Sequence, residues 1–344
     1  MHQIHYEPQA FIDSNITLIA CGPGRDNPKG VMDMGALNFS RLFVLLVLLL
    51  NYSCQSESKN YREVSIKPPE QARAEAEVDS EQDSDDVKSE KVSSAGECFQ
   101  SADGDYTEKG PDGFKEGPSN SGRFIITPQN MKDGCKYSVI VFGMGTGAPT
   151  SAYTGFYEHF ASYGFVVVVD PTKNGQSSGE SMRATLDWAY QSELKDMLSD
   201  KAGATGHSQG GGGAYATSSH DKIKAIVGLQ PGQFRSANNT TAAYLGLAGT
   251  NDSFGVFTNP SFLHYPGSVG VDKFMASHVG ANHIQSMINT QSGPGVNYKA
   301  AATAWFRCYL ADDENACQIF SSGTCDKLPG GGSNWTECKG QMAK

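Results

Sequence analysis

Short apolar runs separated by glycine- and proline-containing turns occupy the chain from about residue 122 to residue 277. Runs that are continuously apolar or rich in β-branched residues predict buried strands, and they lie at 122–128, 137–142, 165–170, 223–229, 242–248 and 273–277. Apolar residues at helical spacing predict helices, and they lie at 153–163, 181–198, 214–218 and 297–310. Strands that alternate with helices indicate an α/β fold with a mostly parallel central sheet covered by helices on both faces.

The first 95 residues show a different pattern. Residues 42–50 form an apolar run directly after Arg41, which is too short to span a membrane and has the length of a signal-peptide core. We therefore interpret residues 1–54 as an N-terminal extension with a signal or lipoprotein-like segment, and we expect translation to start at Met32 or Met34. Residues 55–95 are rich in Ser, Glu, Asp, Lys and Gln, and predict a disordered acidic linker before a globular domain at 96–344.

Export of this chain leaves two destinations open. Ser53 precedes Cys54, as at the lipidation site of a bacterial lipoprotein, although Asn51 stands where an aliphatic residue is usual. Lipid anchoring to a membrane through Cys54 and plain secretion are both compatible with this segment. The sequence therefore predicts a secreted or cell-surface protein, and we expect a monomer.

Net charge adds little to this picture. The formal charge is −10, but residues 70–90 carry about nine acids and two bases, roughly −7 by counting, so the remainder is nearly neutral. No basic stripe is present, which argues against nucleic-acid binding.

Six of the eight cysteines follow the acidic segment. An even set in an exported chain predicts disulfides, and neighbours in sequence favour Cys308 with Cys317 and Cys325 with Cys338. Cys98 and Cys135 would then form the third pair. A zinc site is the alternative, but the chain has no C-x-x-C pair here and no histidine among the last four cysteines, so we expect no metal.

A G-x-S-x-G motif centres on Ser208, with Gly206 and Gly210 on either side. A serine on a sharp strand-to-helix turn needs small residues at these positions, because neighbouring backbone comes too close for a Cβ atom. A pattern with three fixed positions also arises by accident in a chain with 39 glycines. The rest of the chain must therefore decide whether Ser208 is a nucleophile.

Residues with the chemistry that Ser208 would need follow in the expected order of serine, acid and histidine. Asp252 comes directly after a predicted strand, and a turn aspartate is the alternative interpretation. His283 lies in a loop of small residues, whereas His278, its nearest rival, is close to a strand and fits a structural role. We predict a catalytic triad of Ser208, Asp252 and His283.

Acyl transfer also requires donors for a developing oxyanion. We expect the backbone N–H of Gln209, after the nucleophile, and that of Met144, after the strand at 137–142. The Met144 side chain would either contact an acyl group or pack in its loop.

No cofactor is expected, since the acids at 103–105 lack the remaining positions of a calcium loop.

Several segments together resemble the α/β-hydrolase family of bacterial cutinases and poly(ethylene terephthalate) hydrolases, which is related to dienelactone hydrolases. The matching segments are 141–144, 160–168, 206–213, 251–253, 280–283 and 304–306. The resemblance implies an α/β-hydrolase fold and the roles given above for the triad, Met144 and Gln209. The chain departs from the family at Met144 and at Gly232, where aromatic residues are usual, and in its cysteine-rich tail.

These features predict a serine esterase that hydrolyses carboxylic esters, polyesters included, through an acyl-enzyme. A lipase acting on acylglycerols is the closest alternative. A non-catalytic α/β-hydrolase homologue that binds a ligand is an alternative of a different class, although a decayed site would be free to lose a member of the triad.

Overall fold

The computed structural model describes residues 104–120, 122–172, 178–232, 241–253, 270–287 and 292–342. The expectations for residues 1–54 and 55–95, including Cys54, lie outside the described residues and stay predictions. Within the described segments, no helix is both long and apolar enough to cross a membrane.

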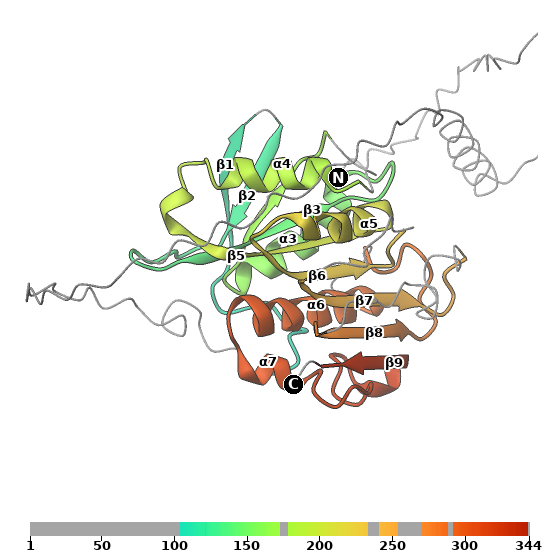
Figure 1. The fold of residues 1–344 in the computed structure, drawn as a ribbon. Coiled ribbons are helices and arrows are strands. Elements are labelled where there is room, and N and C mark those ends of the chain that lie inside the picture. The colour runs from blue at the N-terminus through green and yellow to red at the C-terminus, as the bar shows by residue number, and fades with distance from the viewer. Residues whose placement is uncertain are drawn as a thin grey trace, which may run out of the picture. The chain divides into compact units, whose positions relative to one another are not determined.

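A single nine-stranded sheet runs through the described part of the chain, in the order β1-β2-β4-β3-β5-β6-β7-β8-β9 (Figure 1). The strands from β4 to β8 in this order pair in parallel, while β1, β2 and β9 pair antiparallel at the two edges. The prediction of a mostly parallel sheet is therefore confirmed. The strand bounds are β1 Lys115–Asn120, β2 Arg123–Thr127, β3 Tyr137–Gly143, β4 Val166–Val169, β5 Leu198–His207, β6 Ile223–Leu229, β7 Ala243–Gly249, β8 Lys273–His278 and β9 Trp335–Gln341.

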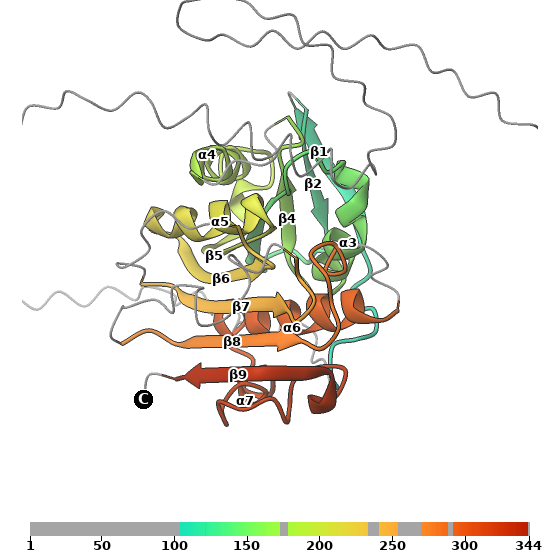
Figure 2. The ribbon, with the colours of Figure 1, turned by 90° about the vertical axis from the view of Figure 1, so that its right-hand side faces the viewer.

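Helices cover both faces of this sheet (Figure 2). The α-helices are α3 Thr154–Ser162, α4 Glu180–Ala189, α5 Gln209–Ala216, α6 Pro294–Leu310 and α7 Glu314–Gln318, and short 3-10 turns lie at Thr150–Tyr153, Lys195–Met197, Thr217–Ser219 and Gly332–Asn334. A Cβ atom on Gly203 of β5 would meet Phe306 of α6, whereas one on Gly206 would meet Gly210 of α5. Because side chains alternate along a strand, α5 and α6 lie on opposite faces. Helix α4 packs beside α5, and α3 packs beside α6.

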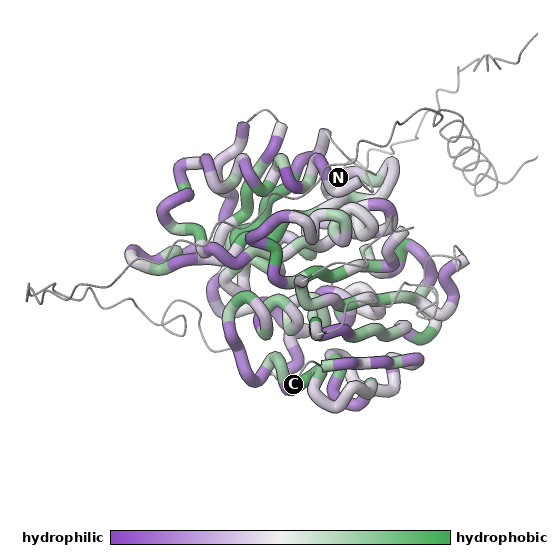
Figure 3. Tube along the Cα trace, viewed as in Figure 1, coloured by the Kyte–Doolittle hydropathy of each residue, from purple (hydrophilic) through white to green (hydrophobic). Residues whose placement is uncertain are grey.

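The core follows the central strands. All four residues of β4 are fully buried, and β3 and β7 are buried along their whole length. Strands covered by helices on both faces must be apolar at every position, which explains the continuous runs in the sequence. Hydrophobic residues accordingly follow the inner strands, while hydrophilic residues predominate in β9 (Figure 3).

One expectation about the elements was wrong, and two edge strands were not predicted. The helix predicted to reach residue 198 ends at Ala189 and is followed by a 3-10 turn at Lys195–Met197. Leu198 is the first residue of β5, and its pairing with Tyr137 places it in the sheet. The edge strands β1 and β9 were not predicted. Their sequences, KEGPSN and WTECKGQ, are largely polar because each strand pairs on one side only.

The cysteine-rich tail forms two of the predicted disulfides. Cys308 is bonded to Cys317, and Cys325 is bonded to Cys338. Cys135 is also disulfide-bonded, but Cys98 lies outside the described residues, so their pairing stays a prediction. The tail packs on the sheet through Phe320, whose ring contacts Phe274 of β8 and Trp305 of α6.

Candidate active site

Ser208 occupies the sharp turn between β5 and α5, with φ +53° and ψ −122°. This positive φ is strained for a residue with a side chain. A Cβ atom on Gly206 or Gly210 would lie within 2.5 Å of the Gly143 backbone. The motif glycines are therefore required by the close approach of β3 and α5, and the sequence interpretation of the turn agrees with the structure.

Parallel pairing places the other predicted residues at the same edge of the sheet. Gly143 at the end of β3 pairs with Gly206, and Gly249 at the end of β7 pairs with His278 at the end of β8. Loops that leave these strands at their carboxyl ends carry Met144, Asp252 and His283 respectively, in the region where ligands bind to open α/β sheets.

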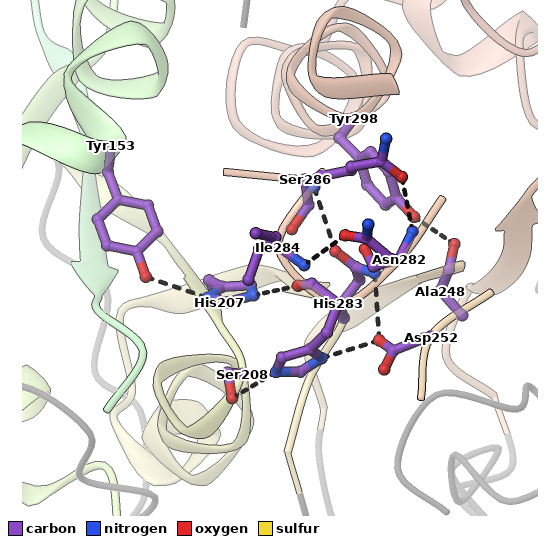
Figure 4. A network of polar contacts seen from close by, with 12 residues as sticks. Tyr153, His207, Ser208, Ala248, Asp252, Asn282, His283, Ile284, Ser286 and Tyr298 are labelled. Carbon is purple, nitrogen blue, oxygen red and sulfur yellow. Dashed lines mark hydrogen bonds and ion pairs between the residues drawn. The ribbon is translucent and has the colours of Figure 1, made fainter. Parts of the chain in front are cut away.

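Ser208, His283 and Asp252 form one hydrogen-bonded line (Figure 4). His283 Nε2 lies 2.9 Å from Ser208 Oγ, and His283 Nδ1 lies 2.8 Å from Asp252 Oδ2. The Asp252 side chain has no exposed surface and the His283 side chain is 13 % exposed. A buried carboxylate that accepts the Nδ1 proton leaves Nε2 able to accept the serine proton.

Gln230 supports this line and was not identified as a site residue from the sequence. Its Nε2 donates to Asp252 Oδ2 at 3.1 Å and to the Asn282 carbonyl at 2.6 Å, and its Oε1 accepts from Ser286 N at 3.2 Å. One buried amide thus joins the aspartate to the loop that carries His283. Its position directly after β6, at the carboxyl edge, was the signal that could have found it.

The two proposed oxyanion donors lie on adjoining backbone segments. Gln209 is the first residue of α5, where N–H groups have no intrahelical acceptor. A Cβ on Gly210 would lie 2.6 Å from the Met144 carbonyl, so Met144 lies against the first turn of α5. The Met144 residue is only 2 % exposed, which favours loop packing over acyl contact for its side chain.

The remaining sequence candidates are not part of the hydrogen-bonded line of Ser208, His283 and Asp252. His278 is buried and bonds to the Val279 carbonyl and to Asn297 rather than to Ser208 or Asp252. Gly232 donates its N–H to the Ser208 carbonyl at 2.5 Å, and a Cβ there would lie 3.1 Å from the same oxygen, so this position has little room for an aromatic side chain. Among the described residues, no cluster of His, Cys, Asp and Glu could hold a metal ion.

A mostly parallel sheet covered on both faces, with a serine on a strand-to-helix turn beside a histidine and a buried aspartate, defines the class of α/β-hydrolases. The chain belongs to the PET hydrolase-like (PETase) family, whose sequence model matches residues 113–331. That region contains Ser208, Asp252 and His283, the two oxyanion candidates and Gln230.

Curated relatives give a second comparison. The chain is 28 % identical over 154 residues to chlorophyllase-1 of Citrus unshiu and, equally, to chlorophyllase-1 of Citrus sinensis. The match covers 41 % of this chain and 40 % of each relative, so the chain spans well under half the length of the curated relatives it matches. The family and these relatives together support a carboxylic ester hydrolase in general terms.

Proposed function

We propose that this protein hydrolyses carboxylic esters with Ser208 as nucleophile. The observation that carries the proposal is the position of His283, whose two ring nitrogens lie within hydrogen-bond distance of Ser208 Oγ and Asp252 Oδ2. A serine hydroxyl is a weak nucleophile unless a base removes its proton, and this geometry supplies the base and the carboxylate that orients it.

The reaction would proceed in two halves. Ser208 Oγ attacks the ester carbonyl while its proton passes to His283 Nε2, and Asp252 stabilises the resulting imidazolium. The backbone N–H groups of Met144 and Gln209 would donate to the oxyanion of the tetrahedral intermediate. His283 then gives its proton to the leaving alcohol, which leaves an acyl-enzyme. A water molecule, deprotonated by His283, releases the acid and restores the Ser208 hydroxyl.

For the substrate, we propose simple aliphatic esters and aliphatic polyesters. Membership of the PET hydrolase-like family supports polymeric esters as one substrate class. The small Gly232 and the buried Met144 stand where an aromatic clamp would be expected, which favours flexible acyl chains over aromatic ones.

We also propose that the protein acts outside the cell or at its surface. The apolar run before Cys54 supports export, and the two tail disulfides support an oxidising compartment. Mass spectrometry of the mature N-terminus tests this: an unprocessed chain would contradict export, and a lipid-modified Cys54 would decide for anchoring over secretion.

Replacing the nucleophile tests the activity. We expect Ser208→Ala to abolish hydrolysis of p-nitrophenyl butyrate and labelling by a fluorophosphonate, because the acyl-enzyme would form on the Ser208 hydroxyl that this change removes. The thermal unfolding midpoint should change little, since the substitution removes a single oxygen. Ser321→Ala, in the exposed tail, is the matched control and should keep both properties. Substantial turnover by purified Ser208→Ala protein would contradict the proposal.

A further inference from the structure

A second line of hydrogen bonds runs behind the site, through residues that the proposed reaction does not use. The Tyr153 hydroxyl lies 2.9 Å from Gly145 N and 3.0 Å from His207 Nδ1, and His207 Nε2 lies 2.8 Å from the His283 carbonyl oxygen (Figure 4). Tyr153 is fully buried and His207 is 3 % exposed. The polar atoms of both side chains are therefore committed to these partners and not to water.

The direction of each bond follows from the acceptors. A carbonyl oxygen only accepts, so His207 Nε2 carries the proton and donates to His283. In the neutral ring Nδ1 then accepts from the Tyr153 hydroxyl, which itself accepts from Gly145 N–H. Burial lowers the pKa of His207 to about 3 and raises the pKa of Tyr153 to about 12. Both groups stay neutral over the range in which ester hydrolysis is measured.

The line connects the three segments that the reaction needs. Gly145 follows Met144, the proposed oxyanion donor; His207 precedes Ser208; and the carbonyl belongs to His283, the proposed base. Binding of the Gly145 N–H fixes the plane of the Met144–Gly145 peptide, since peptide groups are planar, and so restrains the backbone directly after the peptide that carries the Met144 N–H. Binding of the His283 carbonyl restrains the backbone from which its imidazole projects.

Close packing indicates that this arrangement is specific. A Cβ atom on Gly145 would lie 2.7 Å from His207 Nδ1 and 3.0 Å from Tyr153 Oη, so a side chain at this position would displace the line. The Tyr153 ring also packs on Phe142 and on the His207 ring, with centroids 5.1 Å and 5.9 Å away. Tyr153 directly precedes helix α3, so the line connects the start of this helix to the turn that carries Ser208.

We propose that Tyr153 and His207 are positioning residues. They hold the backbone at Met144 and Gly145 and the loop that carries His283 in fixed positions relative to Ser208. The proposal rests on the proposed function, because it assigns these residues a role in the same reaction. Their contribution belongs to the transition state, when donor and base must both be aligned. Loss of the hydrogen bonds among Tyr153, His207 and the His283 carbonyl should therefore lower kcat, while KM changes little.

Tyr153→Phe is the first test, because it removes the hydroxyl and keeps the ring. We expect kcat for p-nitrophenyl butyrate to fall about 10- to 100-fold, with KM within about threefold of the parent value. Tyr157→Phe is the matched control. Tyr157 lies one turn further along, in α3, its ring also packs on Phe142, and its buried hydroxyl has no hydrogen-bond partner among the described residues. We expect its kcat to stay within about twofold of the parent.

His207 gives a second, independent test. His207→Phe keeps a ring but loses both bonds, and should lower kcat at least as much as Tyr153→Phe. His207→Gln can still donate to the His283 carbonyl and accept from Tyr153, so it should recover part of the lost kcat. In the variant that carries both Phe substitutions, kcat should fall no further than in His207→Phe alone, because residues that act as one unit are not additive.

Controls separate this inference from the proposed function and from misfolding. Kinetic values are expressed per active site, counted by fluorophosphonate labelling of Ser208. If the parent shows no Ser208-dependent hydrolysis, both proposals fail. If the parent is active but Tyr153→Phe matches Tyr157→Phe per labelled site, only the inference is overturned. An equal loss in His207→Gln and His207→Phe would likewise overturn it, because packing alone would then explain the effect.

Discussion

Two nearby histidines have clearly different environments. His283 bridges Ser208 and Asp252, whereas His278 donates from Nδ1 to the Val279 carbonyl and accepts at Nε2 from Asn297. Burial lowers the pKa of His278. Its ring packs against Tyr298 and Trp335, with centroids 5.7 Å and 5.0 Å away. Hydrogen bonding and packing thus assign His278 to the framework that holds the end of β8.

Alanine substitutions should separate these two roles. We expect His283→Ala to lower kcat/KM by several orders of magnitude with a small effect on unfolding, because His283 is the proposed acceptor of the Ser208 proton and its Nε2 lies 2.9 Å from Ser208 Oγ. His278→Ala should instead lower the free energy of unfolding by about 2 to 4 kcal/mol, through the cavity and the lost hydrogen bonds. Kinetics and urea denaturation of both variants give the comparison. Equal kinetic losses in fully folded variants would mean that His278 takes part in the reaction.

Gly232, at a position where related polyester hydrolases usually have an aromatic residue, packs against the turn that carries Ser208. Its N–H binds the Ser208 carbonyl, and a Cβ atom would lie 3.2 Å from Gln209 N, which is a proposed oxyanion donor. An aromatic residue at this position would therefore have to move the backbone of the nucleophile turn. The close packing of that turn therefore explains why an aromatic residue does not fit at position 232 in this structure.

At the scale of elements, the tail extends the sheet next to the candidate site. Strand β9 pairs antiparallel with β8, and the Val279 N–H donates to the Asn334 carbonyl at 2.8 Å, directly before the loop that carries His283. The Cys325–Cys338 disulfide joins β9 to the preceding turns, while Cys308–Cys317 joins α6 to α7. Both bridges close short loops of the chain.

Removing either bridge should therefore destabilise the protein. We expect the paired substitutions Cys325→Ser with Cys338→Ser, and Cys308→Ser with Cys317→Ser, each to lower the free energy of unfolding by roughly 2 to 4 kcal/mol. Thermal unfolding with and without a reductant measures the effect. Each variant should respond less to the reductant than the parent does. A parent whose unfolding midpoint is insensitive to reductant, although peptide mapping shows the bridges reduced, would contradict this expectation.

At the scale of the whole molecule, buried neutral histidines make the folded state sensitive to acid. Burial lowers the pKa of His159 and of His207 to about 3, and the charge of Lys299 adds to the effect at His159. In the unfolded chain a histidine titrates near pH 6.5. Between pH 6.5 and 3 the unfolded state therefore binds more protons than the folded state, and stability falls as the pH is lowered through this window.

His159 offers a test of this acid sensitivity away from Ser208. We expect the parent to be less stable at about pH 4.5 than at about pH 7.5, and His159→Phe to reduce that difference by about 2 to 3 kcal/mol, since the variant removes one titrating group and keeps a ring. Urea denaturation of both proteins at the two pH values provides the measurement. An unchanged difference in His159→Phe would show that His159 can be protonated in the folded protein.

Substrate preference is also a property of the whole molecule, because several loops line the edge that carries the site. We expect initial rates to be higher on polycaprolactone and on short aliphatic esters than on amorphous poly(ethylene terephthalate). A missing aromatic contact of about 0.5 to 1.5 kcal/mol weakens ring binding roughly twofold to tenfold. The Ser208→Ala protein serves as the background control. Faster hydrolysis of the aromatic polymer would indicate an aromatic contact supplied by other residues.

The sequence by itself determined the class of sheet and the order of the site residues. Continuous apolar runs are required where helices cover both faces of a sheet, so β3, β4, β6, β7 and β8 could be recognised from composition. The G-x-S-x-G spacing is a local steric requirement, and it identified the turn at Ser208. Short spacing along the chain likewise favoured the two tail disulfides that the structure contains.

Only the tertiary structure decided which distant groups meet. The polar edge strands β1 and β9 pair on one side only, so their sequences carry no continuous apolar signal. The helix at 180–189 ends before residue 198, which pairs with β3 as the first residue of β5, and helical periodicity does not report that pairing. The side chains of Gln230, Tyr153 and His207 form hydrogen bonds with residues up to 76 sequence positions away. Such contacts depend on how strands stack side by side, which no local pattern of residues encodes.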